Sequence, residues 1–164
     1  MQITVDNLTC DGVRGLLEEH LTDMYATSPP ESVHALDMNA LKHSAITFWS
    51  ARENGVVLGC VALKALTLTH GEIKSMRTAD KGRNRGVGSA LLTHLIHQAK
   101  QRGYQQLSLE TGSMEYFAPA RRLYHKFGFE YCGPFADYAW DPNSCYMTRV
   151  IDNNATGPTL AQLN

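Results

Sequence analysis

Residues 71–92 constrain this chain more than any other stretch, because they read as a strand, a basic turn with glycines, and the start of a helix. From Gly88 to Ala99, small and apolar residues recur at helical spacing. In residues 72–78 the alternation of side chains is typical of a strand. It predicts two faces, one with Ile73, Ser75 and Arg77 and the other with Glu72, Lys74 and Met76.

The turn between these two elements is suited to a phosphate. Backbone N–H groups at the start of a helix point outward, and the helix dipole adds partial positive charge. Gly86 and Gly88 have no Cβ, so a phosphate can approach the backbone, and Arg83 and Arg85 add cationic donors. The turn is neither a P-loop, which needs Gly-Lys-Ser/Thr, nor a Rossmann turn, which needs a third glycine or alanine where Leu91 stands.

The remaining sequence predicts a mixed α/β order. Asn54-Gly55 between two apolar runs indicates a hairpin, and Gly103 and Gly128 stand where helices end. The unit 72–110 predicts a parallel, right-handed crossover. Predicted strands cover residues 1–5, 45–52, 56–69, 72–78, 104–110, 131–135 and 144–151. Predicted helices cover 11–25, a short segment capped by Asp37 and ending at 41 or 42, 86–102, and 119–127.

Composition fits one folded domain of 1–152 followed by a flexible tail, 153–164. The chain has 164 residues, 43% hydrophobic residues and a net charge of −1, which gives no global reason to bind nucleic acid or a membrane. The N-terminus lacks the features of a signal peptide, and no apolar run approaches the roughly 18 residues of a membrane span. These features favour a cytoplasmic protein.

Cysteines and histidines do not form recognisable metal or disulfide patterns. The four cysteines, Cys10, Cys60, Cys132 and Cys145, are scattered, which predicts reduced and mostly buried thiols. His94 and His97 would share a helix face, but no third ligand stands nearby and there is no HExxH motif. Structural zinc sites need four ligands and catalytic ones three, so we expect no metal.

Two motifs resemble those of the Gcn5-related N-acetyltransferase (GNAT) superfamily. Residues 83–88, Arg-Asn-Arg-Gly-Val-Gly, match the acetyl-CoA-binding pattern Arg/Gln-x-x-Gly-x-Gly/Ala directly after a strand. Residues 120–129 match a second pattern, Ala-x-x-Leu-Tyr-x-x-x-Gly-Phe. With the order of elements, the resemblance covers nearly the whole chain. It implies an α/β (α+β) fold, in which a mixed central sheet of about seven strands is flanked by about four helices.

The resemblance implies acetyl-CoA as the acetyl donor. Pantetheine would pair with the backbone of residues 76–78 where two parallel strands splay apart, and the N–H of Arg77 or Met76 would face the thioester oxygen. The usual asparagine ahead of the last helix is replaced by Phe117-Ala118-Pro119, so the resemblance does not carry its contact to CoA over to this chain. The implied donor-binding residues are Met76, Arg77, Thr78, Arg83, Asn84, Arg85, Gly86, Val87, Gly88 and Ser89.

Acetyl transfer to an amine needs an acid and a base. The resemblance implies that Tyr124 protonates the departing thiolate, although Tyr124 could instead be a packed helix aromatic. An amine with a pKa near 10 is protonated at neutral pH, so a base or a desolvating pocket is required. The resemblance implies Glu72 as the first candidate base, unless it only pairs with Lys74 or Arg77. Glu110 is a rival, with His70 and His34 behind it.

The acceptor side is less specific. The Pro29-Pro30 loop is equally consistent with a connector and with a lid over the acceptor pocket. The polar, aromatic run 137–144 could form a wall of that pocket or only cap the last two strands. Asp137 and Asp141 would suit a cation, whereas Arg77, Arg121 or Arg122 would suit a carboxylate. The expected acceptor-pocket residues are His34, Ser113, Met114, Phe117, Tyr138, Asp141, Asn143 and Ser144.

Taken together, these features predict an enzyme that moves an acetyl group directly from acetyl-CoA to the primary amine of a small-molecule or amino-acid-like acceptor. No cysteine lies in a motif that would favour an acyl-cysteine intermediate. The alternative is a non-catalytic acyl-CoA-binding sensor that keeps the phosphate turn. A C-terminal edge strand could also pair two chains into a homodimer.

Overall fold

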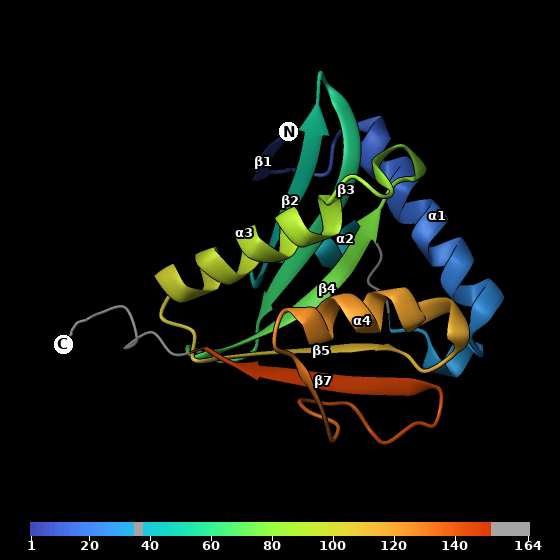
Figure 1. Cartoon of the computed structure of the whole chain (residues 1–164), viewed down its shortest axis with the longest axis vertical. Helices are drawn as coiled ribbons and strands as arrows, with labels where there is room; N and C mark the ends of the chain where they lie inside the picture. The colour runs from blue at the N-terminus through green and yellow to red at the C-terminus, as the bar shows by residue number, and fades with distance from the viewer. Residues whose placement is uncertain (35–37, 152–164) are drawn as a thin grey trace.

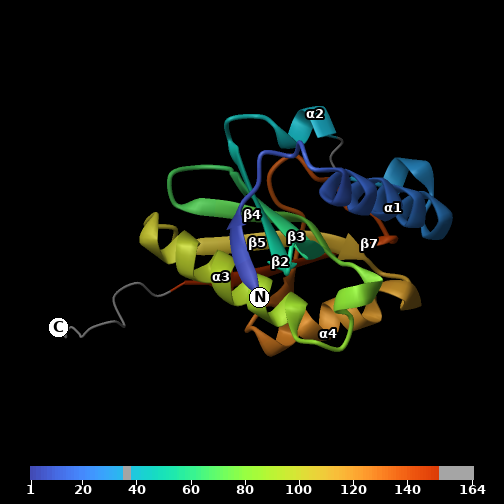
Figure 2. The same cartoon turned by 90° about the horizontal axis from the view of Figure 1, so that it is seen from above.

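A seven-stranded mixed sheet forms the centre of the fold, with helices on both faces (Figures 1 and 2). The computed structural model describes residues 1–34 and 38–151. The strand order is β1-β2-β3-β4-β5-β7-β6. The strands are β1 (Gln2–Val5), β2 (Ile46–Glu53), β3 (Val56–Ala65), β4 (His70–Thr78), β5 (Gln106–Gly112), β6 (Glu130–Cys132) and β7 (Ser144–Val150). The helices are α1 (Asp11–Thr27), α2 (Met38–Leu41), α3 (Val87–Gln101) and α4 (Ala118–Lys126), with 3₁₀ turns η1 (Pro30–Ser32), η2 (Asp80–Gly82) and η3 (Glu115–Phe117).

This architecture is the mixed sheet and the four helices predicted for the GNAT fold. Local signals placed several boundaries correctly. Asn54 and Gly55 have φ values of 51° and 80°, as a tight hairpin turn requires, and β2 pairs antiparallel with β3. Gly103 and Gly128, at φ values of 82° and 89°, follow the ends of α3 and α4. The crossover through α3 makes β4 and β5 parallel neighbours.

Two apolar cores lie on opposite faces of the sheet. On one face, α3 buries Leu91, Leu92 and Leu95 completely against the inward residues of the central strands. Each such side chain stabilises the fold by about 1.5–3 kcal/mol relative to an exposed one. On the other face, α1 packs Val13 and Leu17 over β2 and β3. Figure 2 shows α1 and α2 on one side of the sheet and α3 and α4 on the other.

The parallel strands β4 and β5 separate before they end. Their pairing runs only from His70–Gln106 to Ile73–Leu109, although β4 continues to Thr78 and β5 to Gly112. The strands therefore open into a V, as expected from the sequence. On its other side, β4 stays paired with β3 as far as Thr78.

A bulge at Ser75 changes the two faces of β4, and here the simple alternation was wrong. Lys74 lies opposite Ala62 and Arg77 opposite Cys60, so three steps along β4 match two along β3. Ser75 takes a positive φ of 52° at this point. Beyond the bulge, Met76 packs on the α3 face with Ile73, whereas Arg77 reaches α1 on the opposite face.

Some expected boundaries also differ. β3 ends at Ala65, and β4 already begins at His70, so the turn is 66–69 rather than His70-Gly71. The strands expected at 104–110 and 131–135 are Gln106–Gly112 and Glu130–Cys132. Of the four cysteines only Cys60 is buried, so the prediction of mostly buried thiols was wrong. All four thiols are free, as expected. Asp37 and the tail 153–164 lie outside the described residues.

Candidate active site

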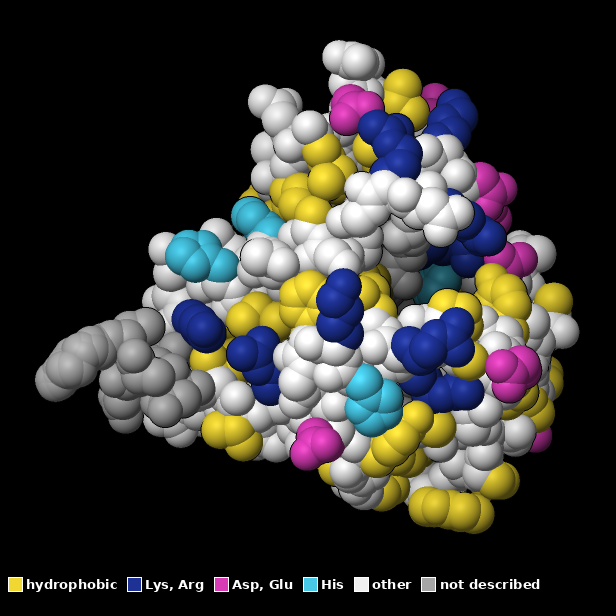
Figure 3. Space-filling view, viewed as in Figure 1, with side chains coloured by type: hydrophobic (Ala, Val, Ile, Leu, Met, Phe, Trp, Pro, Cys, Tyr) yellow, Lys and Arg dark blue, Asp and Glu magenta, His cyan; other side chains and the backbone are white. Residues whose placement is uncertain are grey.

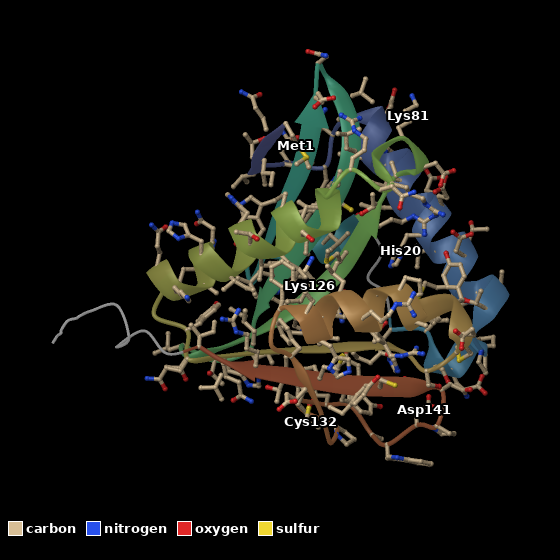
Figure 4. All side chains as sticks on the ribbon, in the orientation of Figure 1. Met1, His20, Lys81, Lys126, Cys132 and Asp141 are labelled. Atoms are coloured by element: carbon tan, nitrogen blue, oxygen red, sulfur yellow. The ribbon has the colours of Figure 1, made fainter. Side chains whose placement is uncertain are left out.

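A groove of about 670 Å³ follows the open end of the V, and we call it the donor groove. One wall is the second half of β4 with the start of α3, and the other is α1, η3 and α4. Figure 3 shows this hollow with basic side chains at its rim and a histidine deep inside, where Figure 4 places His20. Burial and the charge of Arg77 lower the pKa of His20 to about 4, so its ring is neutral near pH 7.

The start of α3 forms the outer end of the donor groove. Gly86 caps the helix with a φ of 75° and no side-chain cap, and the amide of Ala90 donates to Gly86 O. The amides of Val87, Gly88 and Ser89 therefore precede the first helical hydrogen bond. A Cβ on Gly88 would lie 3.0 Å from Leu123 Cδ2 and 3.4 Å from Met76 Cε, so a larger side chain here would crowd this wall of the groove.

Nine of the ten predicted donor-binding residues line this groove, and Arg85 does not. The Arg85 side chain instead pairs with Glu53 at the end of β2. Arg83 lines the groove while bridging Asp80 at 3.1 Å. Arg77 is held by Glu19 and Asp23 of α1 at 2.5 and 2.6 Å, and its Nε is buried without a hydrogen-bond partner among the described residues.

A smaller chamber of about 100 Å³ lies farther into the V, and we call it the inner cavity. It is lined by Glu72 and Lys74 of β4, Glu110 of β5, and Tyr124 of α4. The inner cavity and the donor groove share five wall residues, namely His20, Met24, Met76, Phe117 and Ala120. A long ligand in the donor groove would thus have its end at the inner cavity.

Glu72 is buried and already bound. Its Oε2 accepts a hydrogen bond from the Tyr138 hydroxyl at 2.5 Å and lies 3.2 Å from the Lys74 ammonium. Lys74 also donates to the Tyr138 hydroxyl at 2.9 Å, so the three groups form a closed ring. Burial and the adjacent Glu72 raise the pKa of Tyr138, which stays a neutral donor. Glu72 therefore does pair with Lys74, but Arg77 turns away to α1.

Glu110 has a different environment from Glu72. Burial raises the pKa of Glu110 to about 7. The hydrogen bond that Glu110 Oε2 accepts from Ser144 Oγ at 2.8 Å acts in the opposite direction and lowers this pKa. A carboxyl group that is half ionised near neutral pH suits proton transfer. Tyr124 is buried beside the same cavity, and burial followed by the charge of Glu110 raises its pKa. Among the described residues, the Tyr124 hydroxyl has no hydrogen-bond partner.

Two loops close over the acceptor side, and we call their contacts the loop clasp. Ser32 Oγ of η1 donates to Asp141 Oδ2 at 2.6 Å, and Asn143 Nδ2 lies 3.5 Å from Ser32 Oγ. The His34 ring packs edge-on against Tyr138, with centroids 5.0 Å apart. The hydrogen bond from Ser32 lowers the pKa of Asp141, and burial lowers that of His34. Figure 4 places Asp141 on the loop that precedes β7.

The predicted acceptor residues fall into three groups. His34 and Phe117 line the inner cavity, while Tyr138, Asp141 and Asn143 belong to the loop clasp or to the ring with Glu72. The others serve local structure. Ser113 Oγ donates to Pro142 O, Met114 O accepts from Arg121, and Ser144 holds Glu110.

Sequence reasoning missed several cavity residues, namely His20, Met24, Ser75, Thr111 and Ala120. Ala120 opens the second motif, but no motif marks the other four, which converge from α1, β4 and β5 only in the folded chain. The bulge at Ser75 had no signal in the sequence pattern, since serine is unremarkable in a strand. Within residues 1–34 and 38–151, no three His, Cys, Asp or Glu side chains are grouped to hold a metal ion, and no helix is long and apolar enough to span a membrane.

The mixed sheet, its flanking helices and the opened pair β4 and β5 form the fold of acyl-CoA N-acyltransferases, and comparison with known proteins agrees. Residues 13–129 match the model of the acetyltransferase (GNAT) family. The chain belongs to this family and is an N-acetyltransferase.

Its relatives share most of their length with it. It is 54% identical to the uncharacterized N-acetyltransferase YsnE of Bacillus subtilis, over 92% of this chain and all of YsnE. It is 38% identical to an IAA acetyltransferase of Azospirillum brasilense, over 86% of this chain and 92% of the relative. A Klebsiella pneumoniae protein described as an acyl-CoA N-acyltransferase has a crystal structure similar to this one, with a TM-score of 0.77 at 26% identity. The match covers 91% of this chain and 96% of that chain. A GNAT acetyltransferase of Elizabethkingia anophelis with acetyl-CoA bound shares the fold, with a TM-score of 0.64 at 21% identity over 92% and 97%.

Proposed function

We propose that this enzyme transfers the acetyl group of acetyl-CoA directly to the primary amine of a small, amino-acid-like acceptor. The observation that carries the proposal is the junction of two chambers at the open V of β4 and β5. The donor groove begins at the uncapped start of α3 and ends where it shares five wall residues with the inner cavity. A thioester at that junction would meet an amine entering from the other side.

The residues of the groove fit the donor. The free amides of Val87, Gly88 and Ser89 suit the pyrophosphate, with Arg83 as a charged donor at the rim. The backbone of Met76–Thr78 faces the groove beyond the point where β4 leaves β5, which suits the amide groups of pantetheine. When bound, acetyl-CoA supplies the activated acetyl group, and its narrow end would lie beside Glu110 and Tyr124.

We propose Glu110 rather than Glu72 as the proton acceptor. Glu72 Oε2 already accepts hydrogen bonds from the Lys74 ammonium and the Tyr138 hydroxyl, so this oxygen is not free to take a proton from the acceptor. Glu110, with a pKa near 7, takes a proton from the entering ammonium and leaves a neutral nucleophile. The acceptor nitrogen loses its second proton to solvent when the new C–N bond forms and the C–S bond breaks.

Tyr124 is the proposed general acid. Its hydroxyl is free of partners among the described residues, and its raised pKa keeps it protonated until a thiolate is beside it. The departing sulfur takes this proton, and Tyr124 regains one from Glu110 or water. One acetyl amide, one thiol and one proton are the net products, so no further reactant is needed.

Calorimetric titration with acetyl-CoA, followed by a thiol-release screen over primary amines with mass detection of the products, tests the proposal. We expect binding, one equivalent of free thiol per acetylated amine, and no reaction with tertiary amines. Binding without an acetylated product for any amine would overturn the proposed function.

A further inference from the structure

Along the wall of the inner cavity, β4 at the bulge carries hydrogen-bond donors that no described residue satisfies. Ser75 is 8% exposed, and its hydroxyl is buried with no hydrogen-bond partner among the described residues. The neighbouring Lys74 has a side chain that is 8% exposed. Its ammonium has three N–H donors, of which two meet Glu72 and Tyr138. Both residues line the inner cavity.

Unsatisfied donors in such a place are costly. A buried polar group without a partner destabilises the fold, and more so when it is charged. The bulge itself adds strain, because Ser75 is a non-glycine residue at a φ of 52°. An anionic group with two oxygens would satisfy the third N–H of Lys74 and the hydroxyl of Ser75 together.

The ring of Lys74, Tyr138 and Glu72 leaves the positive charge of Lys74 available to a ligand. Tyr138 accepts from Lys74 and donates to Glu72, so Glu72 is shared between two donors and only partly neutralises the ammonium. His34, the nearest basic ring, has a lowered pKa because of burial and the charge of Lys74. Among the described residues that line this chamber, Lys74 is therefore the cation near pH 7.

Glu110 lies on β5, across the opening from these donors, and its carboxyl group interacts electrostatically with Lys74. The chamber holds only about 100 Å³, room for a few non-hydrogen atoms. Donors that would suit a carboxylate and the carboxyl group proposed to receive an ammonium proton thus line one small space. An α-amino acid has these two charges one carbon apart.

We propose that Lys74 and Ser75 bind the α-carboxylate of the acceptor, so that the enzyme acetylates free α-amino acids in preference to simple amines. This inference rests on the proposed N-acetyltransferase function. Lys74 is then a specificity residue for the acceptor, and Glu110 acts on the amine of the same molecule. The side chain of the amino acid would extend toward the loop clasp.

The first test uses the wild-type enzyme, so it does not depend on any variant folding. Alanine and phenylalanine are each compared with their α-amides and with the decarboxylated amines, ethylamine and phenethylamine. An α-amino group next to an amide titrates near 8, about two units below an alkyl amine. A bias from amine basicity would therefore favour the amide. We expect kcat/KM for the acid to exceed that of both analogues at least tenfold.

The second test uses Lys74→Gln, which retains N–H donors for Glu72 and Tyr138 but removes the charge. We expect KM for phenylalanine to rise at least tenfold, while KM for phenethylamine changes less than threefold. Ser75→Gly, which also suits the positive φ, should raise KM for phenylalanine several-fold. Lys126→Gln, on the exposed end of α4, serves as the control and should change neither substrate.

A binding readout without turnover completes the test. N-acetylphenylalanine should bind the wild-type protein at least tenfold more tightly than N-acetylphenethylamine in calorimetry, and Lys74→Gln should abolish the difference. Turnover of amines with no preference for the acid, or equal losses on both substrates in Lys74→Gln, would overturn the carboxylate site while leaving the proposed function intact. No acetylated product from any amine would overturn both.

Discussion

The donor side and the acceptor side of this site are built in opposite ways. At the start of α3 the donor groove is lined by one short segment, residues 82–89 without Arg85, whose backbone amides are the proposed phosphate ligands. The acceptor side depends on single side chains from η1, β4, β5 and the loop before β7. Figure 4 shows this separation, with Lys81 directly before residues 82–89 and Asp141 at the far end of the molecule.

The two halves of the site differ in the source of their specificity. Backbone amides at a helix start bind any phosphate of suitable shape, so a short local pattern suffices. Charged side chains in a small, buried chamber respond to one another, and moving one changes the ionisation of the rest. The predictions below test whether the acceptor side is the more sensitive half.

The largest effect is expected for Glu110→Gln. The substitution preserves shape and a hydrogen bond to Ser144, but it removes the proposed proton acceptor. We expect kcat/KM to fall by about 10²–10⁴-fold, the usual range for a general base. In the wild type, kcat/KM should rise with pH through about 7 as Glu110 ionises, and this limb should be lost in the variant.

Glu72→Gln is the matched comparison for this prediction. It should destabilise the ring with Lys74 and Tyr138 but leave the rise in kcat/KM near pH 7 in place. The reverse result, in which Glu72→Gln removes the pH limb and Glu110→Gln retains it, would return the role of the base to Glu72.

Tyr124→Phe should have the next largest effect, at the junction of the two halves. We expect kcat to fall by roughly 10²-fold because the thiolate loses its proton donor, with the Kd for acetyl-CoA nearly unchanged. Steady-state rates and calorimetry measure the two quantities separately. Turnover at the wild-type rate would make Tyr124 a packing residue against Phe129, whose ring centroid is 6.0 Å away.

The same contrast explains what the sequence could predict. Turn residues such as Asn54-Gly55 and Gly86 carry local signals, so the order of elements was predictable. Nine of the ten residues that the resemblance named for the donor line the groove, and their part in binding stays a prediction. Ser75 was not, because a bulge depends on the register between β3 and β4 rather than on serine itself. That one extra residue reverses the faces of Met76 and Arg77.

Contacts between residues far apart in the sequence also limited what could be predicted about the site. The pattern predicted Arg85 as a phosphate ligand, but the hairpin of β2 and β3 brings Glu53 to it. In the same way, Tyr138 was expected to contact the acceptor, whereas the loop clasp directs its hydroxyl to Glu72. Such contacts join residues 32 and 66 positions apart, which no local pattern encodes.

Arg83→Ala probes the donor side. Loss of one charged donor from the rim should weaken acetyl-CoA binding by about 1–3 kcal/mol, at least about fivefold in Kd. Arg85→Ala is the matched control, because Arg85 lies in the same motif but does not line the groove, and its Kd should change less than twofold. Calorimetry with acetyl-CoA at fixed ionic strength measures both. Equal losses in the two variants would mean that the basic turn acts only through its general charge.

The smallest expected effect is on stability, and it again concerns Glu110. Its pKa is about 7 in the folded protein and about 4.5 when unfolded, so the native state holds this proton more tightly. The stabilisation from that proton is complete below about pH 4.5 and is lost as pH rises through 7. At pH 8 the native state therefore carries a buried charge that Glu110→Gln removes.

We expect Glu110→Gln to be more stable than the wild type by about 1–2 kcal/mol at pH 8, below the full linkage value of about 3 kcal/mol because the side chain is only half-buried. At pH 4.5 the difference should largely disappear. Urea unfolding at both pH values measures it, and Glu110 would then be retained for catalysis at a cost in stability. A variant that is less stable at pH 8 would show that Ser144 and Lys74 already compensate the charge, and the acceptor side would then carry no more strain than the donor groove.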